Sequence, residues 1–200
     1  YEISLGLVGS EMCIRDRFVK DLYLANMKAG VDYMEFGYKA SSEIFNPDNF
    51  GKWKFCHEKD IRNIVGDNKT DMKISVMADV GRTDYKKDIL NRKDSVIDLI
   101  RVATYINTIP AAIEMLEDAK KKGYETTVNI MAVSKVNDED LDGGLELLAQ
   151  SSVDVIYLVD SFGAFYPEQI ERLCDKYLNV AAKYLSLIHI SEPTRPRLIS

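Results

Sequence analysis

Charged and polar side chains stand at the ends of several apolar segments of this 200-residue chain. An acidic group can transfer a proton, and the planar donor fork of an arginine suits a carboxylate or a carbonyl acid. Burying such groups is costly unless they are paired or needed. For any one of these side chains, a structural salt bridge or a helix cap explains its position as well as a functional role does. Several segments that all end in this way favour a functional site. The side chains are Glu35 in YMEFGY, Asp79 in VMADVGR, Arg101 and Thr104 in LIRVATY, Asn129 in VNIMAV, and Asp160 and Ser161 in YLVDSFG.

The segments that carry these side chains have the apolar, β-branched composition of buried strands. We predict strands over 31–37, 72–80, 96–104, 126–133 and 153–160, and helices over 18–30, 109–123, 137–150 and 167–184. Strands that alternate with helices imply right-handed crossovers and a parallel sheet. Functional groups in such folds gather at the carboxyl ends of the strands. The sequence therefore predicts an α/β fold with its polar side chains along one edge.

The two ends of the chain differ from its middle. One legal set of codons for Leu7–Arg17 has a reverse complement that translates as Leu185–Arg195, which is eleven consecutive matches. The shared DNA contains the mosaic end of a transposase-type sequencing adapter. We therefore expect residues 1–17 and 185–200 to be adapter-derived and only residues 18–184 to be native. A genuine terminal strand and tail that match by coincidence is the alternative.

The remaining length selects between two α/β architectures. The strand spacing is near that of a (β/α)₈ TIM barrel, but such a barrel typically needs about 250 residues. Five strands therefore indicate either a small doubly wound domain or a barrel cut at both ends. Because adapters bound the insert at points of DNA breakage and the insert begins inside a helix, we expect a partial TIM barrel with its second to sixth strands.

The overall composition excludes several classes of partner. With 46% hydrophobic and 29% charged residues and a net charge of −6, the chain has the composition of a soluble protein without a footprint for nucleic acid or an anionic membrane. No apolar run is long enough to span a membrane. The three cysteines form no CxxC pairing, so a zinc site or a disulfide framework is not expected. We expect a cytoplasmic protein.

The motifs GVDYMEFGY, LIRVATY, VNIMAV and IYLVDSFGAFYPEQI together resemble the metal-dependent aldolase and hydroxymethylglutaryl-CoA lyase-like barrels, known as DRE-TIM metallolyases. The nearest resemblance is to 4-hydroxy-2-oxovalerate aldolase-type catalytic domains, and it covers residues 18–184. It implies that Glu35 matches the second-strand Glu beside the reaction centre. Arg101 matches the fourth-strand Arg, and Asp160 and Ser161 match the sixth-strand pair near the substrate carbonyl. Tyr105 stands where these aldolases commonly have His, which leaves the acyl acceptor open.

The resemblance also implies a divalent cation, Mn²⁺ or Mg²⁺, in the full-length parent. The family binds it through an N-terminal D-x-T-x-R-D-G segment, which also holds the catalytic Arg, and an H-x-H pair. This chain has neither motif, and His57 is expected to face solvent. We therefore expect no bound metal and no activity in the chain itself.

For the parent the resemblance implies a carbon–carbon lyase that cleaves a 4-hydroxy-2-oxo acid to pyruvate and an aldehyde. Claisen condensation with an acyl-CoA, as in isopropylmalate synthase, is the runner-up. A non-catalytic α/β binding module and a homo-oligomeric parent remain open.

Overall fold

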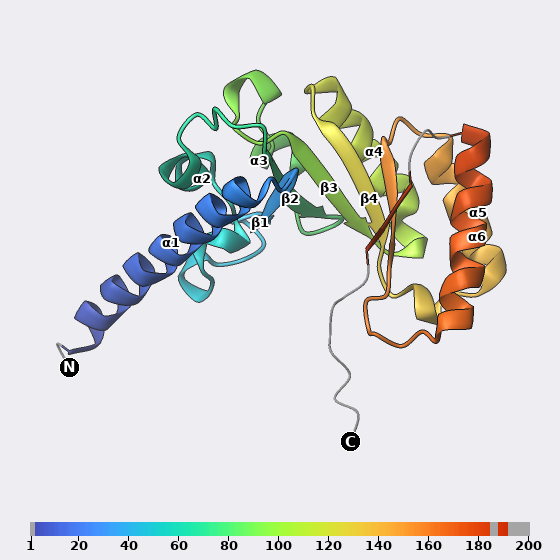
Figure 1. Cartoon of the computed structure of the whole chain (residues 1–200), viewed down its shortest axis with the longest axis horizontal. Helices are drawn as coiled ribbons and strands as arrows, with labels where there is room; N and C mark the ends of the chain where they lie inside the picture. Colours follow the sequence, from blue (N-terminus) through green and yellow to red (C-terminus); the bar gives the residue numbers. More distant parts are fainter. Residues whose placement is uncertain (1–2, 185–187, 192–200) are drawn as a thin grey trace.

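The computed structural model describes residues 3–184 and 188–191, and it has an α/β architecture (Figure 1). The strands are β1 Tyr33–Tyr38, β2 Lys73–Asp79, β3 Leu99–Thr104, β4 Glu125–Ile130, β5 Val155–Val159 and β6 Ile188–Ser191. The helices are α1 Ile3–Ala29, α2 Glu58–Val65, α3 Tyr85–Asp88, α4 Ile109–Lys121, α5 Asp138–Ala149 and α6 Pro167–Tyr184. Each of the five predicted strands and each of the four predicted helices is present, with boundaries shifted by a few residues except at the start of α1.

The strands form one parallel sheet in the order β1-β2-β3-β4-β5-β6. This order follows the chain, as in a barrel wall, and it does not reverse direction in the middle as a doubly wound sheet does. Within the described residues β1 pairs only with β2, and β6 pairs only with β5. The sheet is therefore open in the described part of the chain.

The helices begin at sequence features that satisfy their free N–H groups. Asn137 caps α5, because its side-chain oxygen accepts a hydrogen bond from Asp140 N at 2.8 Å. Pro167 and Pro110 occupy the first turns of α6 and α4, where proline removes no helical hydrogen bond. His57 precedes α2 and is exposed, as predicted. None of the helices in the described ranges is long and apolar enough to cross a membrane.

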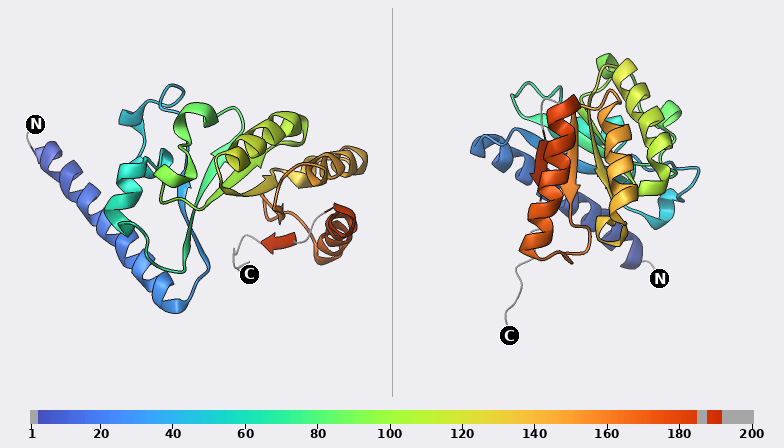
Figure 2. Two further views of the ribbon diagram at one scale, coloured as in Figure 1. Left: turned by 90° about the horizontal axis from the view of Figure 1, so that it is seen from above. Right: turned by 90° about the vertical axis from the view of Figure 1, so that its right-hand side faces the viewer.

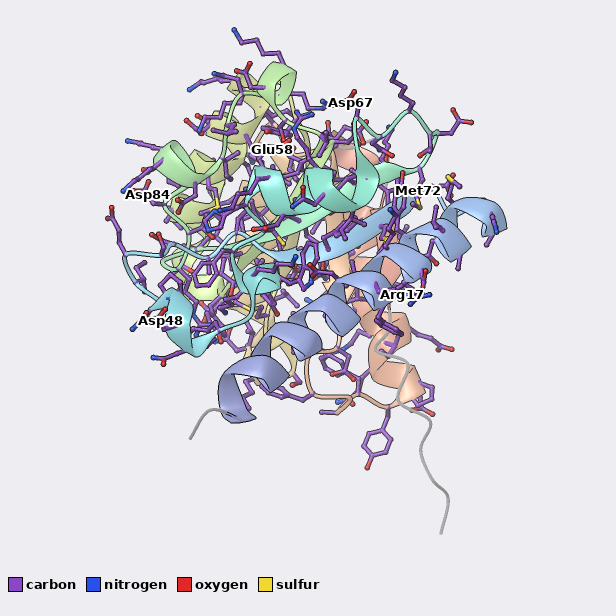
Figure 3. The ribbon with its side chains drawn as sticks, turned by 90° about the vertical axis from the view of Figure 1, so that its left-hand side faces the viewer. Arg17, Asp48, Glu58, Asp67, Met72 and Asp84 are labelled. Carbon is purple, nitrogen blue, oxygen red and sulfur yellow. The ribbon has the colours of Figure 1, made fainter. Side chains whose placement is uncertain are left out.

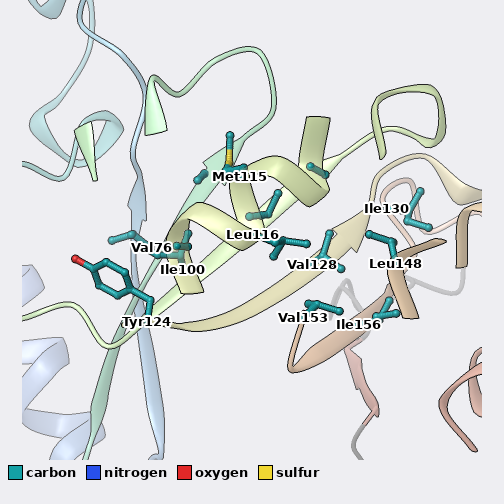
Figure 4. Close-up of a cluster of buried hydrophobic side chains, with 14 of the residues drawn as sticks. Val76, Ile100, Met115, Leu116, Tyr124, Val128, Ile130, Leu148, Val153 and Ile156 are labelled. Carbon is teal, nitrogen blue, oxygen red and sulfur yellow. The ribbon is translucent and has the colours of Figure 1, made fainter. Parts of the chain in front are cut away.

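One face of the sheet is apolar and covered by helices α4, α5 and α6 (Figure 2). Met115 and Leu116 of α4 lie in one buried cluster with Ile100 and Val128 of the adjacent strands (Figure 4). Because side chains alternate along a strand, the residues between them point to the opposite face. We call this opposite side the open face, since it carries the exposed or half-buried side chains of the strands. They include Glu35, Lys73, Met77, Arg101, Glu125 and Tyr157.

Two elements extend into segments that we expect to be adapter-derived. Helix α1 begins at Ile3 instead of Phe18, and its first half runs away from the sheet (Figure 1). No proline interrupts residues 3–17, so no residue in this segment forces the helix present from Phe18 onward to stop there. Ile188–Ser191 adds a sixth strand beside β5, where five strands were predicted. Its alternating isoleucines suit a strand whatever the origin of the DNA. Residues 1–2, 185–187 and 192–200 of those segments lie outside the described residues.

Candidate functional site

Two of the predicted site residues meet on the open face. Arg101 donates from Nε to Glu35 Oε2 at 2.7 Å and from Nη2 to Glu35 Oε1 at 2.6 Å. Glu35 lies on β1 and Arg101 on β3, so the pair reaches across strand β2. The side chains are 31% and 22% exposed respectively. This bidentate geometry is the strong form of an ion pair, and it fixes the plane of the guanidinium. The two residues predicted as part of a functional site thus also form a salt bridge with each other.

Tyr157 completes the surroundings of Arg101, and sequence reasoning missed it. Its ring lies 6.0 Å from the guanidinium carbon, within cation–π range. Tyr157 is on β5, paired with Asn129 of β4, and its neighbours in the strand, Ile156 and Leu158, are buried on the opposite face. A lone aromatic residue in an apolar strand is an ordinary core residue by pattern. Only the strand order shows that it lies near Arg101.

Asp79 is a buried carboxylate at the carboxyl end of β2. It is 6% exposed, and Oδ1 has no hydrogen-bond partner in the described part of the chain. Arg82 Nη1 lies 3.6 Å from Oδ2, and Arg82 was also missed by sequence reasoning. Burial raises the pKa of Asp79, although the nearby cations Arg82, Lys54 and Arg101 act in the opposite direction. An unpaired buried oxygen of this kind can accept a hydrogen bond from a ligand.

Lys54 brings a further positive charge to this end of the sheet. Its ammonium lies 4.6 Å from the ring centres of both Tyr38 and Phe45 and 5.9 Å from that of Phe50. Phe45 and Phe50 themselves pack edge to face at 5.6 Å. The segment after β1 thus holds a cation on an aromatic surface near Asp79. The sequence contains these aromatic residues but does not indicate their common partner.

Asn129 and Thr104 are also buried at the carboxyl ends of their strands. Asn129 is 4% exposed, and its Oδ1 has no hydrogen-bond partner among the described residues. In the sheet register Asp79 pairs with Ala103, and Ala103 pairs with Asn129. Two buried oxygens therefore flank one small side chain. Thr104 has a local role, because its hydroxyl lies 2.9 Å from the hydroxyl of Thr108 at the start of α4.

Asp160 and Ser161 follow β5 and organise the neighbouring loops. Asp160 accepts hydrogen bonds from Phe165 N at 3.0 Å and Phe162 N at 3.4 Å. Burial by itself raises the pKa of Asp160, but the backbone N–H groups of residues 162–165 outweigh it and hold the pKa below its usual value. Ser161 Oγ accepts from Ala132 N, at 3.0 Å, in the turn after β4. The substrate-binding role predicted for both residues stays a prediction.

The described residues do not fit a divalent cation by themselves. Among them no three His, Cys, Asp or Glu side chains converge as a metal-binding group. The carboxylate of Glu35 already accepts hydrogen bonds from Arg101, and that of Asp160 accepts them from backbone N–H groups. Cys56 is buried and its thiol has a pKa raised to about 12 by burial, whereas Cys174 is half-buried. No reaction step can be derived through a metal held by these residues.

The fold matches that of an aldolase domain. A crystal structure of the N-terminal domain of a protein described as an aldolase, from Bacteroides vulgatus, superposes with a TM-score of 0.64 at 23% identity. The match covers 81% of this chain and 52% of that one. At this identity the likeness establishes the α/β fold. No protein-family model matches the chain.

Comparison with the sequences of known proteins identifies enzymes to which the chain is related. The chain is 31% identical over 98 residues to a 4-hydroxy-2-oxovalerate aldolase of Geobacillus genomosp. 3, a match that covers 48% of this chain and 29% of the relative. It is 26% identical over 134 residues to 4-hydroxy-2-oxovalerate aldolase 3 of Rhodococcus opacus (strain B4), covering 64% and 39%. The chain is thus a distant homologue of 4-hydroxy-2-oxovalerate aldolases over about half its length, and it spans less than half of each relative. The resemblance seen in the sequence motifs is confirmed.

Proposed function

We propose that this chain is part of the catalytic domain of a carbon–carbon lyase that cleaves a 4-hydroxy-2-oxo acid to pyruvate and an aldehyde. The observation that carries the proposal is the Glu35–Arg101 pair on the open face, in a chain homologous to 4-hydroxy-2-oxovalerate aldolases. In this proposal β1 to β5 are the second to sixth strands of a (β/α)₈ barrel, whose interior is the open face.

Arg101 is the proposed substrate-binding residue. Glu35 occupies Nε and Nη2, so the Nη1 edge of the guanidinium is the side that can bind a substrate carboxylate or carbonyl oxygen. Glu35 acts on substrate only through Arg101, as a positioning residue. The unpaired oxygens of Asp79 and Asn129 can accept hydrogen bonds from a hydroxyl group of the same substrate. Asp160 and Ser161 hold the loops that border the site.

We also propose that the full-length parent uses Mn²⁺ or Mg²⁺. Such an ion, when bound, supplies Lewis-acid stabilisation of the enolate formed on carbon–carbon cleavage. The described residues do not form a site for such an ion, and the roles assigned above to Arg101, Glu35 and Asp79 are substrate binding and positioning.

The test compares this chain with the product of the gene extended at both ends. Purified proteins are given 4-hydroxy-2-oxovalerate with Mn²⁺, and pyruvate is detected with lactate dehydrogenase. We expect the extended protein to release pyruvate, to stop with EDTA, and to lose activity in Arg101→Lys, which keeps the charge but not the planar fork. Full activity without metal would refute metal dependence. A second assay with acetyl-CoA and 2-oxo acids measures CoA release, and turnover only there would replace the aldolase by a condensing enzyme. If neither assay shows turnover, the result supports a non-catalytic binding module.

The adapter origin of residues 1–17 and 185–200 is a separate proposal, which rests on the antisense relationship of the two ends. Sequencing the same locus from a library made without transposase adapters tests it. Different residues at both ends would support the adapter origin, and recovery of the same two ends would refute it.

A further inference from the structure

A cavity of about 180 Å³ is bordered by the segment after β1, the start of α2 and the short helix α3. Glu58 and Asp84, which mark the last two elements, are labelled in Figure 3. Its apolar walls are Ala40, Phe55 and Leu90. Neither Glu35 nor Arg101 lines it, so it is separate from the site proposed above.

Lys39 is the most unusual side chain in this cavity. It is 4% exposed, although lysine is almost never fully buried without an ionic partner. In the described part of the chain its ammonium donates to a backbone carbonyl, that of Cys56 at 2.8 Å, and forms no ion pair with a carboxylate. Burial lowers the pKa of Lys39, and the opposing charges of Glu58, Asp60 and Asp88 only partly compensate. Burial therefore favours the neutral amine over the charged ammonium.

Asp88 lines the same cavity as Lys39. Its Oδ2 is buried and has no hydrogen-bond partner among the described residues. Burial raises the pKa of Asp88, so its protonated form is stabilised relative to that of an exposed aspartate. An amine and a carboxyl group that line one cavity, with burial favouring the neutral form of each, can exchange protons with a bound molecule.

The other ionisable groups that line the cavity already have partners. Glu58 accepts from Val96 N at 2.7 Å and from Ser95 Oγ at 2.8 Å. Lys87 forms an ion pair with Glu43. His57 is exposed and stacks on Phe55 with ring centres 5.8 Å apart, so it forms part of the rim. Lys39 and Asp88 are thus the groups left to act on a ligand.

We propose that Lys39 is the nucleophile of a carbonyl-binding site that takes small aldehydes or 2-oxo acids as an imine. The neutral amine nitrogen attacks the carbonyl carbon, and a proton passes from that nitrogen to the carbonyl oxygen to give a carbinolamine. Asp88 donates a proton to the hydroxyl group, which leaves as water, and takes back the proton released from nitrogen. The amine and the carbonyl compound together give the imine and one water, without an oxidant or a reductant. The small cavity limits the carbonyl compound to a few carbon atoms.

Reductive trapping tests this proposal on the chain as it is. The protein is incubated near neutral pH with glyoxylate and sodium cyanoborohydride, which converts an imine to a stable carboxymethyl-lysine, and modified lysines are located by peptide mass mapping. The exposed Lys59 on α2 is the internal comparison. We expect Lys39 to be labelled faster than Lys59. The same experiment with pyruvate shows whether ketones are also accepted.

Variants separate the roles of the two groups. Asp88→Asn is expected to slow labelling of Lys39 without changing that of Lys59, and Lys39→Arg to leave the cavity unlabelled. Trp53 fluorescence checks that each variant is folded. The comparison of Lys39 with Lys59 in the unmodified sequence needs no variant, so it stands even where a variant fails to fold. Labelling of Lys39 that is absent, or no faster than that of Lys59, would overturn the proposal.

Discussion

Gly37 lies where strand β1 comes closest to the turn at Lys52–Lys54, and its replacement by alanine tests this packing. A Cβ atom built on Gly37 would overlap the Trp53 carbonyl oxygen and lie 3.2 Å from both the Trp53 carbonyl carbon and Cys56 Sγ. Most of the overlap is with backbone, which no side-chain rotation relieves. Alanine at this position must therefore push the Lys52–Lys54 turn away from β1.

The cost follows from the interactions that such a shift disturbs. Ala40 N donates to Lys54 O at 3.1 Å, and Lys39 Nζ donates to Cys56 O at 2.8 Å. Each hydrogen bond contributes about 0.5–1.5 kcal/mol. The rings of Phe36 and Trp53, 5.6 Å apart, contribute about 0.5–1.5 kcal/mol more. The reduced entropy of the unfolded chain opposes these losses by about 0.4–1 kcal/mol. We expect Gly37→Ala to lower the free energy of unfolding by about 0.5–4 kcal/mol.

Urea unfolding followed by tryptophan fluorescence measures the effect, because Trp53 is the single tryptophan of the chain. Gly51→Ala is the matched control. Gly51 lies at the start of the same turn with φ −68° and ψ 154°, and a Cβ there would meet nothing within 4 Å. The control should be unchanged or slightly stabilised. Equal unfolding free energies for the two variants would show that the turn moves without cost and would refute the reasoning.

Three further predictions concern α5, Asp160 and the Glu35–Arg101 pair. Gly143→Ala should raise the unfolding free energy by about 0.5–1 kcal/mol, because a Cβ there has open space in a helix. Gly144→Ala should gain less in the same urea assay, since its Cβ would come within 2.6 Å of two isoleucine methyl groups. Because the folded pKa of Asp160 is depressed, its contribution is present above the unfolded value near 3.9 and disappears as pH falls through the folded value. Asp160→Asn should therefore destabilise the protein at about pH 6 but have little effect near pH 2, and equal effects at both would contradict the assigned cause. A double-mutant cycle with Glu35→Gln and Arg101→Gln should give a coupling energy of about 1–3 kcal/mol, and additive effects would show that the pair is not coupled.

The order and type of the main elements can be predicted from the sequence alone, since strand and helix patterns are local. The helix cap Asn137 and the terminal Gly123 after α4 lie at or within two residues of the structural boundaries, because each satisfies backbone groups of its own helix. It also indicated Glu35 and Arg101 as unusual residues, because a charge in an apolar strand stands out by pattern. The extension of α1 and the added strand β6 are not predicted, since both lie in the segments that we expect to be adapter-derived.

Tertiary structure decided which of these residues meet. Glu35 and Arg101 are 66 positions apart in the chain, and only the curvature and register of the sheet bring their side chains together. Tyr157, Arg82 and Lys54 gave no sequence signal for their contacts, because an aromatic residue or a surface cation has no fixed partner at a fixed spacing. The cavity at Lys39 arises in the same way, from three segments whose packing is not encoded within any one of them. The propensity for a helix or a strand depends on residues that are adjacent in the sequence, whereas the burial and pairing of side chains depend on residues that are distant in it.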